Sequence, residues 1–294
     1  MNRAKLRTTL TPYLFLAVPV TVYMIWVIGP MIYSFYLSLT RWDGFSAPQF
    51  IGFSNFTRLF QDPVFYTSLW NNLEWIAAFM TIPIVMGLFI AMSLNRDIPG
   101  SKAFKAGFFA PMVLSLVVSG LVWSWLYNPG FGLINSVLRR VGLGELARGW
   151  LSEPEVVMEA VIAVAVWRQV GYVMVLYLAG LQSVDRNLID ASQVDGANAV
   201  QRFFNVILPQ LAPVTVVVIV ISIIDSLRAF DLVSVMTRGG PFNSSSVLAN
   251  YMYIQAFNNY NMGYGAAVSV VLFMISAAFI LFYLTRIVRE ETNG

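Results

Sequence analysis

Six long apolar stretches constrain this chain more than any other feature, because each is long enough to cross a lipid bilayer. A helix needs roughly 20 apolar residues to span the hydrocarbon core, and a spanning segment must satisfy its backbone hydrogen bonds internally. We therefore predict an all-α, polytopic membrane protein that forms one transmembrane domain over residues 1–294. The predicted spans are 13–38, 73–94, 106–127, 156–181, 214–235 and 262–283.

The composition supports this prediction and excludes several kinds of chemistry. Only 11% of the residues are charged and 58% are apolar, whereas about 25% of the residues of a soluble domain are charged. The chain contains no Cys and no His, which removes disulfide bonds, Cys or His metal ligands and the common pairs of a nucleophile with an imidazole. We expect no metal site, no cofactor and no enzymatic activity in this chain.

The distribution of Lys and Arg predicts the orientation of the spans, since positive residues concentrate on the cytoplasmic side. The pair Arg139 and Arg140 would lie outside and weakens the bias. We expect both termini, and the loop between the fourth and fifth spans, on the cytoplasmic side of a bacterial-type inner membrane. The basic residues on that side are Arg3, Lys5, Arg7, Arg96, Lys102, Lys105, Arg186, Arg202, Arg286 and Arg289.

One polar stretch, 188–213, separates the fourth and fifth predicted spans. Its first part can form two amphipathic turns, Gly196 then permits a tight turn, and Asn198 can cap a second short helix. Pro209 and Pro213 bend the chain back towards the next span. We predict a helix–turn–helix elbow that docks a soluble partner. The alternative is an amphipathic segment that lies in water or among lipid headgroups.

Polar residues inside the fifth predicted span share one helix face. Four positions follow i, i+3, i+4, i+7 spacing: Ser222, Asp225, Ser226 and Ala229. An ionisable side chain inside a span is costly and usually faces protein or water, and hydroxyl and carboxylate oxygens can bond to sugar hydroxyls. We predict that this face lines a ligand path. The alternative is an internal salt-bridge ladder of Asp225, Arg228 and Asp231.

The fourth predicted span carries polar and aromatic side chains within an aliphatic helix. Trp167, Arg168, Gln169 and Tyr172 lie together there, and rings combined with amides are typical of carbohydrate contacts. We predict that Gln169 and Tyr172 contact the ligand. Arg168 paired with an acid on a neighbouring helix, and Trp167 packed on lipid, are the alternatives.

Two further regions carry expectations about the outer side. In the second span, Asn71, Asn72 and Glu74 lie near the outer end, where we expect an interfacial role. The loop 128–155 is long enough for a short helix over 134–141, and it either packs on the other loops or docks an external partner.

The chain has no G-x-x-x-x-G-K-[ST] phosphate loop, so it does not bind ATP in that way. A soluble catalytic domain has no room between the predicted spans. We therefore expect any ATP-dependent work to be done by another protein.

Several motifs, in order along the chain, resemble those of the binding-protein-dependent ABC importer permeases of the carbohydrate type. The polar stretch holds Asp190-Ala191-Ser192, Asp195-Gly196-Ala197 and Ile207-Leu208-Pro209, which are similar to the EAA–x–x–DGA…LP signature of that family. Asp190 stands where Glu is usual, and Ser192 replaces the second Ala. Matching segments elsewhere are FIGFSNFTRLFQDPVF (50–65), FAPMV (109–113), YNPGFGLIN (127–135), LAGLQSVD (178–185) and TRGGPFNSS (237–245).

The resemblance implies a type I ABC importer fold, in which six spans carry a cytoplasmic coupling helix within 186–213. In that family the coupling helix seats in a groove of an ATPase dimer that hydrolyses ATP. A second permease and an extracytoplasmic solute-binding protein complete the transporter. By resemblance, the coupling residues are Asp190, Ala191, Ser192, Asp195, Gly196 and Ala197.

The resemblance also implies where the substrate lies. The sugar site of maltose-type permeases draws on the fourth and fifth spans, which corresponds to Tyr172, Ser222 and Ser226. We expect a neutral mono- or oligosaccharide as the substrate, with a glycerol phosphate as the alternative. An ion-coupled secondary transporter, a membrane enzyme and a scaffold for an ATPase are the other functions considered.

Overall fold

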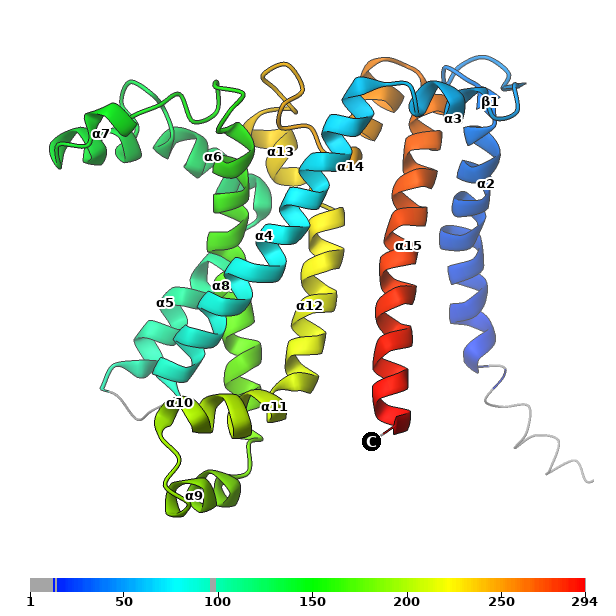
Figure 1. Cartoon of the computed structure of the whole chain (residues 1–294). Coiled ribbons are helices and arrows are strands. Elements are labelled where there is room, and N and C mark those ends of the chain that lie inside the picture. The colour runs from blue at the N-terminus through cyan, green and yellow to red at the C-terminus, as the bar shows by residue number, and fades with distance from the viewer. Residues whose placement is uncertain (1–12, 14, 96–98, 294) are drawn as a thin grey trace, which may run out of the picture. The chain divides into compact units, whose positions relative to one another are not determined.

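The structure is a computed structural model that describes residues 13, 15–95 and 99–293, most of them helical (Figure 1). The chain divides into two compact units. One unit is Met1–Asp62 with Met252–Met274, and the other is Pro63–Tyr251 with Ile275–Gly294. That the chain acts as one domain over 1–294 stays a prediction.

Within the second unit, helices α4 (Pro63–Leu94), α8 (Val157–Gln182) and α12 (Ala212–Leu227) form the centre. Two glycines allow helices α4 and α5 (Ser101–Val113) to pack closely on α8. A Cβ atom on Gly87 of α4 would lie 2.6 Å from Val173 Cγ1, and one on Gly171 of α8 would lie 1.9 Å from the Phe108 carbonyl oxygen. Both glycines are therefore required by packing, and α8 lies between α4 and α5.

The third predicted span is not one helix. Helix α5 ends at Val113, α6 (Leu116–Leu126) begins after a break, and the two meet at 100°. Pro111 removes a backbone donor near the end of α5, and the Ser115 hydroxyl caps α6 by accepting from the Val118 N–H at 3.2 Å. The continuous helix predicted over 106–127 is therefore wrong at residues 114–115.

The fifth predicted span is also interrupted, because three residues separate the end of α12 at Leu227 from the start of α13 (Asp231–Met236). On the side of the polar stretch, the segments Ala199–Gln210 and Ala212–Met236 meet at 68°. Among the described residues, four helices are long and apolar enough to span a membrane, and up to six if each bent pair counts as one span.

The N-terminal part of α4 is covered by the loop that follows α13. Asn71 is buried, and its Nδ2 donates to the carbonyl oxygens of Ser244 and Ser246, both at 2.7 Å. Asn72 is buried too, since its Nδ2 donates to the Ser226 carbonyl at 3.1 Å and its Oδ1 accepts from the Leu248 N–H at 2.8 Å. The interfacial role predicted for both asparagines is wrong, because the loop and α14 (Leu248–Tyr253) use them as internal anchors.

The other unit combines the first span with the start of the last helix. Its helical elements are η1 (Met24–Ile28), α2 (Gly29–Ser38), α3 (Ser54–Leu59), η4 (Ile254–Asn258) and α15 (Met262–Asn293), which continues into the second unit. Strands β1 (Thr40–Arg41) and β2 (Gln49–Phe50) pair antiparallel. The buried Asn55 Nδ2 donates to the Ser38 and Thr40 carbonyls at 2.9 and 2.8 Å, which fixes α3 against this hairpin.

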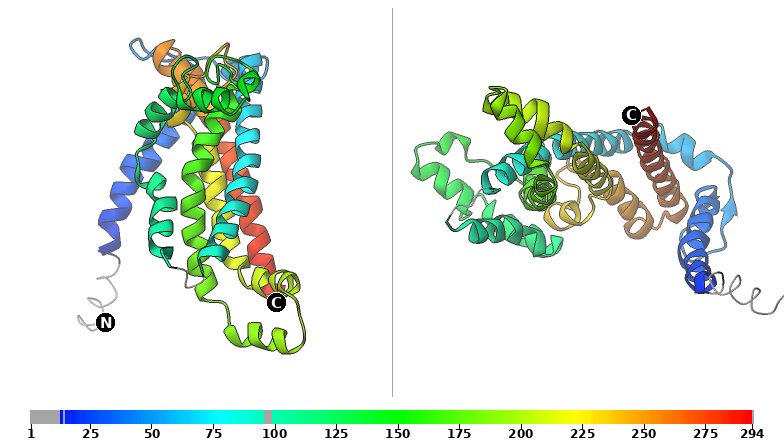
Figure 2. Two further views of the ribbon diagram at one scale, coloured as in Figure 1. Left: turned by 90° about the vertical axis from the view of Figure 1, so that its left-hand side faces the viewer. Right: turned by 90° about the horizontal axis from the view of Figure 1, so that it is seen from below.

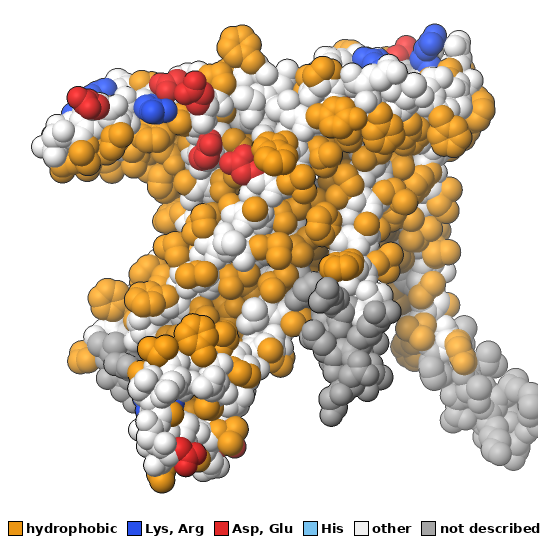
Figure 3. Space-filling model, viewed as in Figure 1, with side chains coloured by type: hydrophobic (Ala, Val, Ile, Leu, Met, Phe, Trp, Pro, Cys, Tyr) orange, Lys and Arg blue, Asp and Glu red, His pale blue; other side chains and the backbone are white. Residues whose placement is uncertain are grey.

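Apolar side chains cover the flanks of the long helices, whereas charged side chains gather towards their ends (Figure 3). In α4, for example, Val85 and Phe89 are exposed. Large exposed apolar surfaces on the sides of long helices are what a lipid environment requires.

Candidate functional site

The polar stretch folds as the predicted elbow. Helix α9 (Arg186–Val194) is followed by a turn at Gly196, whose φ of +78° is easily adopted only without a side chain. Asn198 and Gln201 then form a reciprocal capping box at 2.9 Å in both directions. Helix α10 (Ala199–Arg202), the π-turn η3 (Phe203–Ile207) and α11 (Leu208–Gln210) complete it. The helix–turn–helix prediction is confirmed.

The inner side of the elbow is fixed to the spans. Ile189 and Ile207 pack against a buried cluster that contains Val184 and Leu211 with residues of α4, α8 and α12. The Asp185 N–H donates to Gln210 Oε1 at 3.0 Å, which ties the start of the elbow to its end. The elbow projects from one end of α8 and α12 (Figures 1 and 2). It therefore moves with these two helices.

The outer side of the elbow is exposed and partly apolar. Val194 is 88% exposed, and Leu188, Val200 and Phe204 are more than half exposed. Single exposed apolar residues are ordinary, but four on one small element are typical of a docking surface.

The six residues predicted to couple to an ATPase all lie on α9 or its turn. Asp190, Ala191, Asp195 and Gly196 are exposed, while Ser192 and Ala197 are half-buried. The Ser192 hydroxyl donates to the Ile189 carbonyl at 2.6 Å. Because this hydroxyl is satisfied within the helix, Ser192 packs much as the usual Ala would. The coupling role of the six residues stays a prediction.

A polar cavity of about 310 Å³ lies among α4, α8 and the two broken spans. The break between α5 and α6 contributes Met112 and Leu116 to its wall, and the break after α12 contributes Phe230. Irregular backbone at membrane depth is tolerated only where protein buries it or a cavity borders it. The cavity therefore accounts for the two helix breaks, because the irregular backbone at each break borders it.

Four charged side chains of α8, α12 and α13 and of the break between α12 and α13 line this cavity. Its polar wall is formed by Arg168, Gln169, Asp225, Arg228 and Asp231, and its aromatic wall by Trp75, Phe79 and Phe230. Gln169 Nε2 donates to Asp225 Oδ2 at 3.3 Å, joining α8 to α12. Arg168 Nη2 donates to the Met112 carbonyl at 3.4 Å and lies in the electrostatic field of both aspartates.

Two guanidinium groups thus face two carboxylates around one space, and their charges balance. Among the described residues, Arg168, Asp225, Arg228 and Asp231 form no ion pair within 4 Å. The Arg168 Nε and the buried Trp75 Nε1 also have no hydrogen-bond acceptor in the described chain. These two donors are enclosed, but the guanidinium and carboxylate groups that line the cavity can bond to the hydroxyl groups of a ligand.

The predicted substrate residues separate into two groups. Gln169, Asp225 and Ala229 line the cavity, whereas Tyr172 does not. Ser222 and Ser226 are fully buried, and the Ser226 hydroxyl donates to the Ser222 carbonyl at 2.6 Å. The alternative ladder of Asp225, Arg228 and Asp231 is wrong, because α12 ends before Arg228 and the three residues do not share a helix.

Several cavity residues were not predicted from the sequence. Trp75 and Phe79 are four residues apart in α4 and therefore share a face, a signal that was available. Met112, Leu116 and Phe230 carry no such signal, because they reach the wall only where the helices break.

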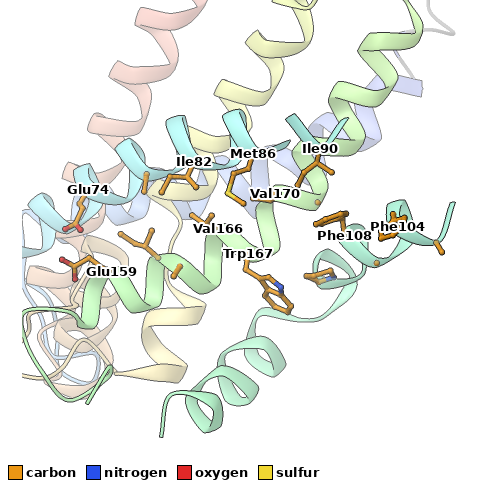
Figure 4. Close-up of a pocket in the computed structure, with 17 residues that line it drawn as sticks. Glu74, Ile82, Met86, Ile90, Phe104, Phe108, Glu159, Val166, Trp167 and Val170 are labelled. Carbon is orange, nitrogen blue, oxygen red and sulfur yellow. The ribbon is translucent and has the colours of Figure 1, made fainter. Parts of the chain in front are cut away.

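A second, larger cavity of about 880 Å³ lies between α4, α5 and α8 (Figure 4). Its walls are apolar, with Met86, Phe108 and Trp167 among them, and Glu74 and Glu159 point towards each other at one end. Walls of this kind suit acyl chains or apolar side chains. They offer little to a polar solute, so the smaller polar cavity is the better candidate for a substrate site.

Comparison with known proteins identifies relatives along most of the chain. The family described as "Binding-protein-dependent transport system inner membrane component" matches residues 76–292. The sulfoquinovosyl glycerol transport system permease protein SmoG of Agrobacterium fabrum is 32% identical over 94% of this chain and 88% of its own length. The probable starch degradation products transport system permease protein AmyD of Thermoanaerobacterium thermosulfurigenes is 33% identical over 93% of both chains.

A solved structure has the same fold. A bacterial ABC transporter involved in the import of the acidic polysaccharide alginate contains a chain that matches with a TM-score of 0.84 and 23% identity. The match covers 97% of this chain and 98% of that chain. The predicted type I importer fold is thereby confirmed, and the chain belongs to the family of binding-protein-dependent transport system inner membrane components.

Proposed function

We propose that this chain is a permease subunit of an ATP-driven importer and moves a carbohydrate across the inner membrane. One observation carries the proposal: the two helices that leave the elbow are the same two that meet in the polar cavity. Helix α8 runs from Gln169 to the elbow, and α12 returns from the elbow to Asp225. Motion imposed on the elbow would therefore change the separation of two cavity walls.

The proposed substrate is a neutral sugar or short oligosaccharide. Relatives named for sulfoquinovosyl glycerol and for starch degradation products support the carbohydrate class. Aromatic walls and balanced charges support a neutral ligand, because Arg168 and Arg228 each face an aspartate in the same space. The glycerol phosphate alternative is not favoured, since a phosphate needs a surplus of positive charge.

The proposed partners follow from what this chain supplies. It would pair with a second permease, and a cytoplasmic ATPase dimer would hold the exposed side of the elbow and hydrolyse ATP. An extracytoplasmic binding protein would deliver the sugar at the opposite end of the spans. Both termini would lie in the cytoplasm, as the distribution of Lys and Arg predicts.

The proposal is tested by purifying the chain with its co-expressed partner subunits and reconstituting the complex into liposomes. We expect ATP hydrolysis to rise when sugar-loaded binding protein is added, and labelled sugar to enter only with ATP. Binding protein without sugar is the matched control. Sugar uptake driven by an ion gradient without ATP would refute the proposal.

A further inference from the structure

Helix α7 (Leu133–Arg140) and the turn after it present an apolar stripe that no described part of the chain covers. Leu133, Val137 and Val141 recur every four residues and therefore share one side of the helix. Their side chains are 56%, 47% and 63% exposed. Three large apolar residues thus face outwards from a helix of eight residues.

The opposite side of α7 is polar and its rotation is fixed. Arg139 lies opposite the stripe, and its Nη2 donates to the Pro129 carbonyl at 2.8 Å. Arg140 follows Val137 by three residues, so it lies at the edge of the stripe, and it is exposed without a hydrogen bond in the described chain. The buried Asn135 donates from Nδ2 to the Arg148 carbonyl at 2.8 Å and accepts from Trp150 Nε1 at 2.7 Å. These two bonds hold the helix, so the apolar stripe cannot simply turn inwards.

The direction of the stripe follows from the place of α7 within its unit. Helix α7 lies to one side of α8, near the level of its N-terminal end, and runs at a steep angle to it (Figures 1 and 2). In the part of the molecule that contains α7, apolar side chains lie on the side that faces the long helices, and charged side chains lie on the opposite side (Figure 3). A protein partner would have to reach the stripe from the region that lipid occupies.

A second observation, an exposed tryptophan next to α7, supports a position of this helix at the membrane surface. Helix α6 packs against α7, and its last turn carries Trp125, which is 68% exposed. Exposed Trp side chains concentrate at the boundary between lipid and water. The apolar side of α7 therefore continues an exposed apolar surface whose tryptophan suits the headgroup region.

We infer that α7 is an interfacial helix that lies in the lipid leaflet at this end of the spans. Its stripe of Leu133, Val137 and Val141 contacts the upper part of the acyl chains, and Arg140 lies at the level of the lipid phosphates. An amphipathic helix in this position sinks its apolar side about 5–10 Å into the boundary between headgroups and acyl chains. The helix anchors the loop between α6 and α8 to lipid.

The absence of Cys makes this inference directly testable. Single variants Val137→Cys and Arg139→Cys, each labelled with the fluorophore NBD, are prepared in the complete transporter. The complexes are placed in nanodiscs of phosphatidylethanolamine and phosphatidylglycerol that contain a lipid with a nitroxide near its headgroup. We expect a blue-shifted emission and strong loss of intensity by the nitroxide lipid for position 137. Aqueous iodide should quench position 139, on the opposite side of the helix, more strongly.

Two results would overturn the inference. Equal quenching of both positions by iodide would place the stripe in water, and protection of position 137 from both quenchers would show that a protein covers it. Val141→Cys, one helical turn further along, repeats the measurement should Val137→Cys fail to fold. Sugar transport itself is not the readout, so the inference can fail while the proposed function stands.

Discussion

Asp225 is the residue whose loss should affect the polar cavity most. It accepts a hydrogen bond from Gln169 at 3.3 Å, which joins α8 to α12 at the cavity wall. At the proposed site a sugar hydroxyl donates a hydrogen bond to the charged Asp225, and such a bond contributes about 1.5–3 kcal/mol. Loss of this bond in Asp225→Ala should therefore raise the KM for sugar uptake by about tenfold or more. The measurement is uptake of labelled sugar into proteoliposomes.

Tyr172→Phe provides the matched control, because Tyr172 lies one turn from Gln169 on α8 but outside the cavity. It should leave KM unchanged. An equal effect of the two variants would show that the sugar does not use the polar cavity as described.

Asp43, in the turn between β1 and β2, allows a prediction about pH. The backbone N–H groups of Ser46 and Phe45 and the Ser46 hydroxyl donate to its Oδ1, and these bonds lower the pKa of Asp43 to about 2. A carboxyl whose pKa is depressed by folding stabilises the fold above its ordinary pKa and loses that effect as the pH falls through the folded value. The turn should therefore keep its hydrogen bonds at pH 4.

Hydrogen exchange of the Phe45 and Ser46 amides, corrected for the intrinsic pH dependence, measures this effect. Protection should be equal at pH 7 and pH 4 in the natural chain and reduced at both pH values in Asp43→Ala. Loss of protection already at pH 4 in the natural chain would contradict the prediction.

At the scale of elements, the contact of α8 with α5 depends on a single missing side chain. A Cβ atom on Gly171 would meet the Phe108 carbonyl oxygen at 1.9 Å, and backbone cannot move aside as a side chain does. Gly171→Val should therefore destabilise the protein by about 1–3 kcal/mol. Gly107→Val on α5 is the control, since that site has no atom within 4 Å. Thermal unfolding in detergent compares the two.

The elbow should tolerate no proline at its turn. Gly196 has a φ of +78° and donates its N–H to the Gln193 carbonyl at 3.0 Å, whereas proline needs φ near −65° and has no N–H. Gly196→Pro should abolish sugar-stimulated ATP hydrolysis. Gly142→Pro, at a φ of +82° in the turn after α7, imposes the same strain away from the elbow. Full stimulation in Gly196→Pro would exclude a coupling role for the elbow.

The sequence predicts elements well where hydrophobicity alone decides them. The span 73–94 lies within α4, the span 156–181 matches α8 to within one residue, and the motif around Gly196 forms the expected elbow. Helix α4 begins ten residues earlier than predicted because its polar N-terminal turns are satisfied by the loop 237–247, a contact between distant segments. The break at 114–115 was missed because the residues around it are as apolar as a continuous span. The break at 228–230 was missed because the spacing of Asp225, Arg228 and Asp231 fits one continuous helix.

The substrate face shows the same limit at finer scale. Helical spacing places Ser222, Asp225 and Ser226 near one another, yet packing on α4 buries the two serines and leaves Asp225 in the cavity. A helix face that carries four residues can thus border both a neighbouring helix and a cavity. Only the neighbouring helix decides which residues border the cavity.

At the scale of the whole molecule, the exposed end of the elbow should determine assembly with the ATPase. Val194 is an apolar side chain that is 88% exposed, and burying a charge in its place at an interface is costly. Val194→Glu should reduce the amount of ATPase that co-purifies with this chain. Phe242→Glu, at a site 93% exposed in the loop after α13, adds the same charge elsewhere and should not. Unchanged ATPase recovery in Val194→Glu would contradict the proposed docking surface.

The hydrogen bond between Gln169 and Asp225 has a thermodynamic consequence for the transport cycle. At the proposed site, a sugar hydroxyl that donates to Asp225 Oδ2 would compete with Gln169 for this oxygen, so sugar binding and closure of α8 on α12 would oppose each other. Such linkage is reciprocal. A conformation that draws the two helices apart would then bind the sugar more tightly, and one that restores the internal bond would help to expel it. Through the Gln169 amide and the Asp225 carboxylate, the separation of α8 and α12 would thus determine how tightly the sugar binds.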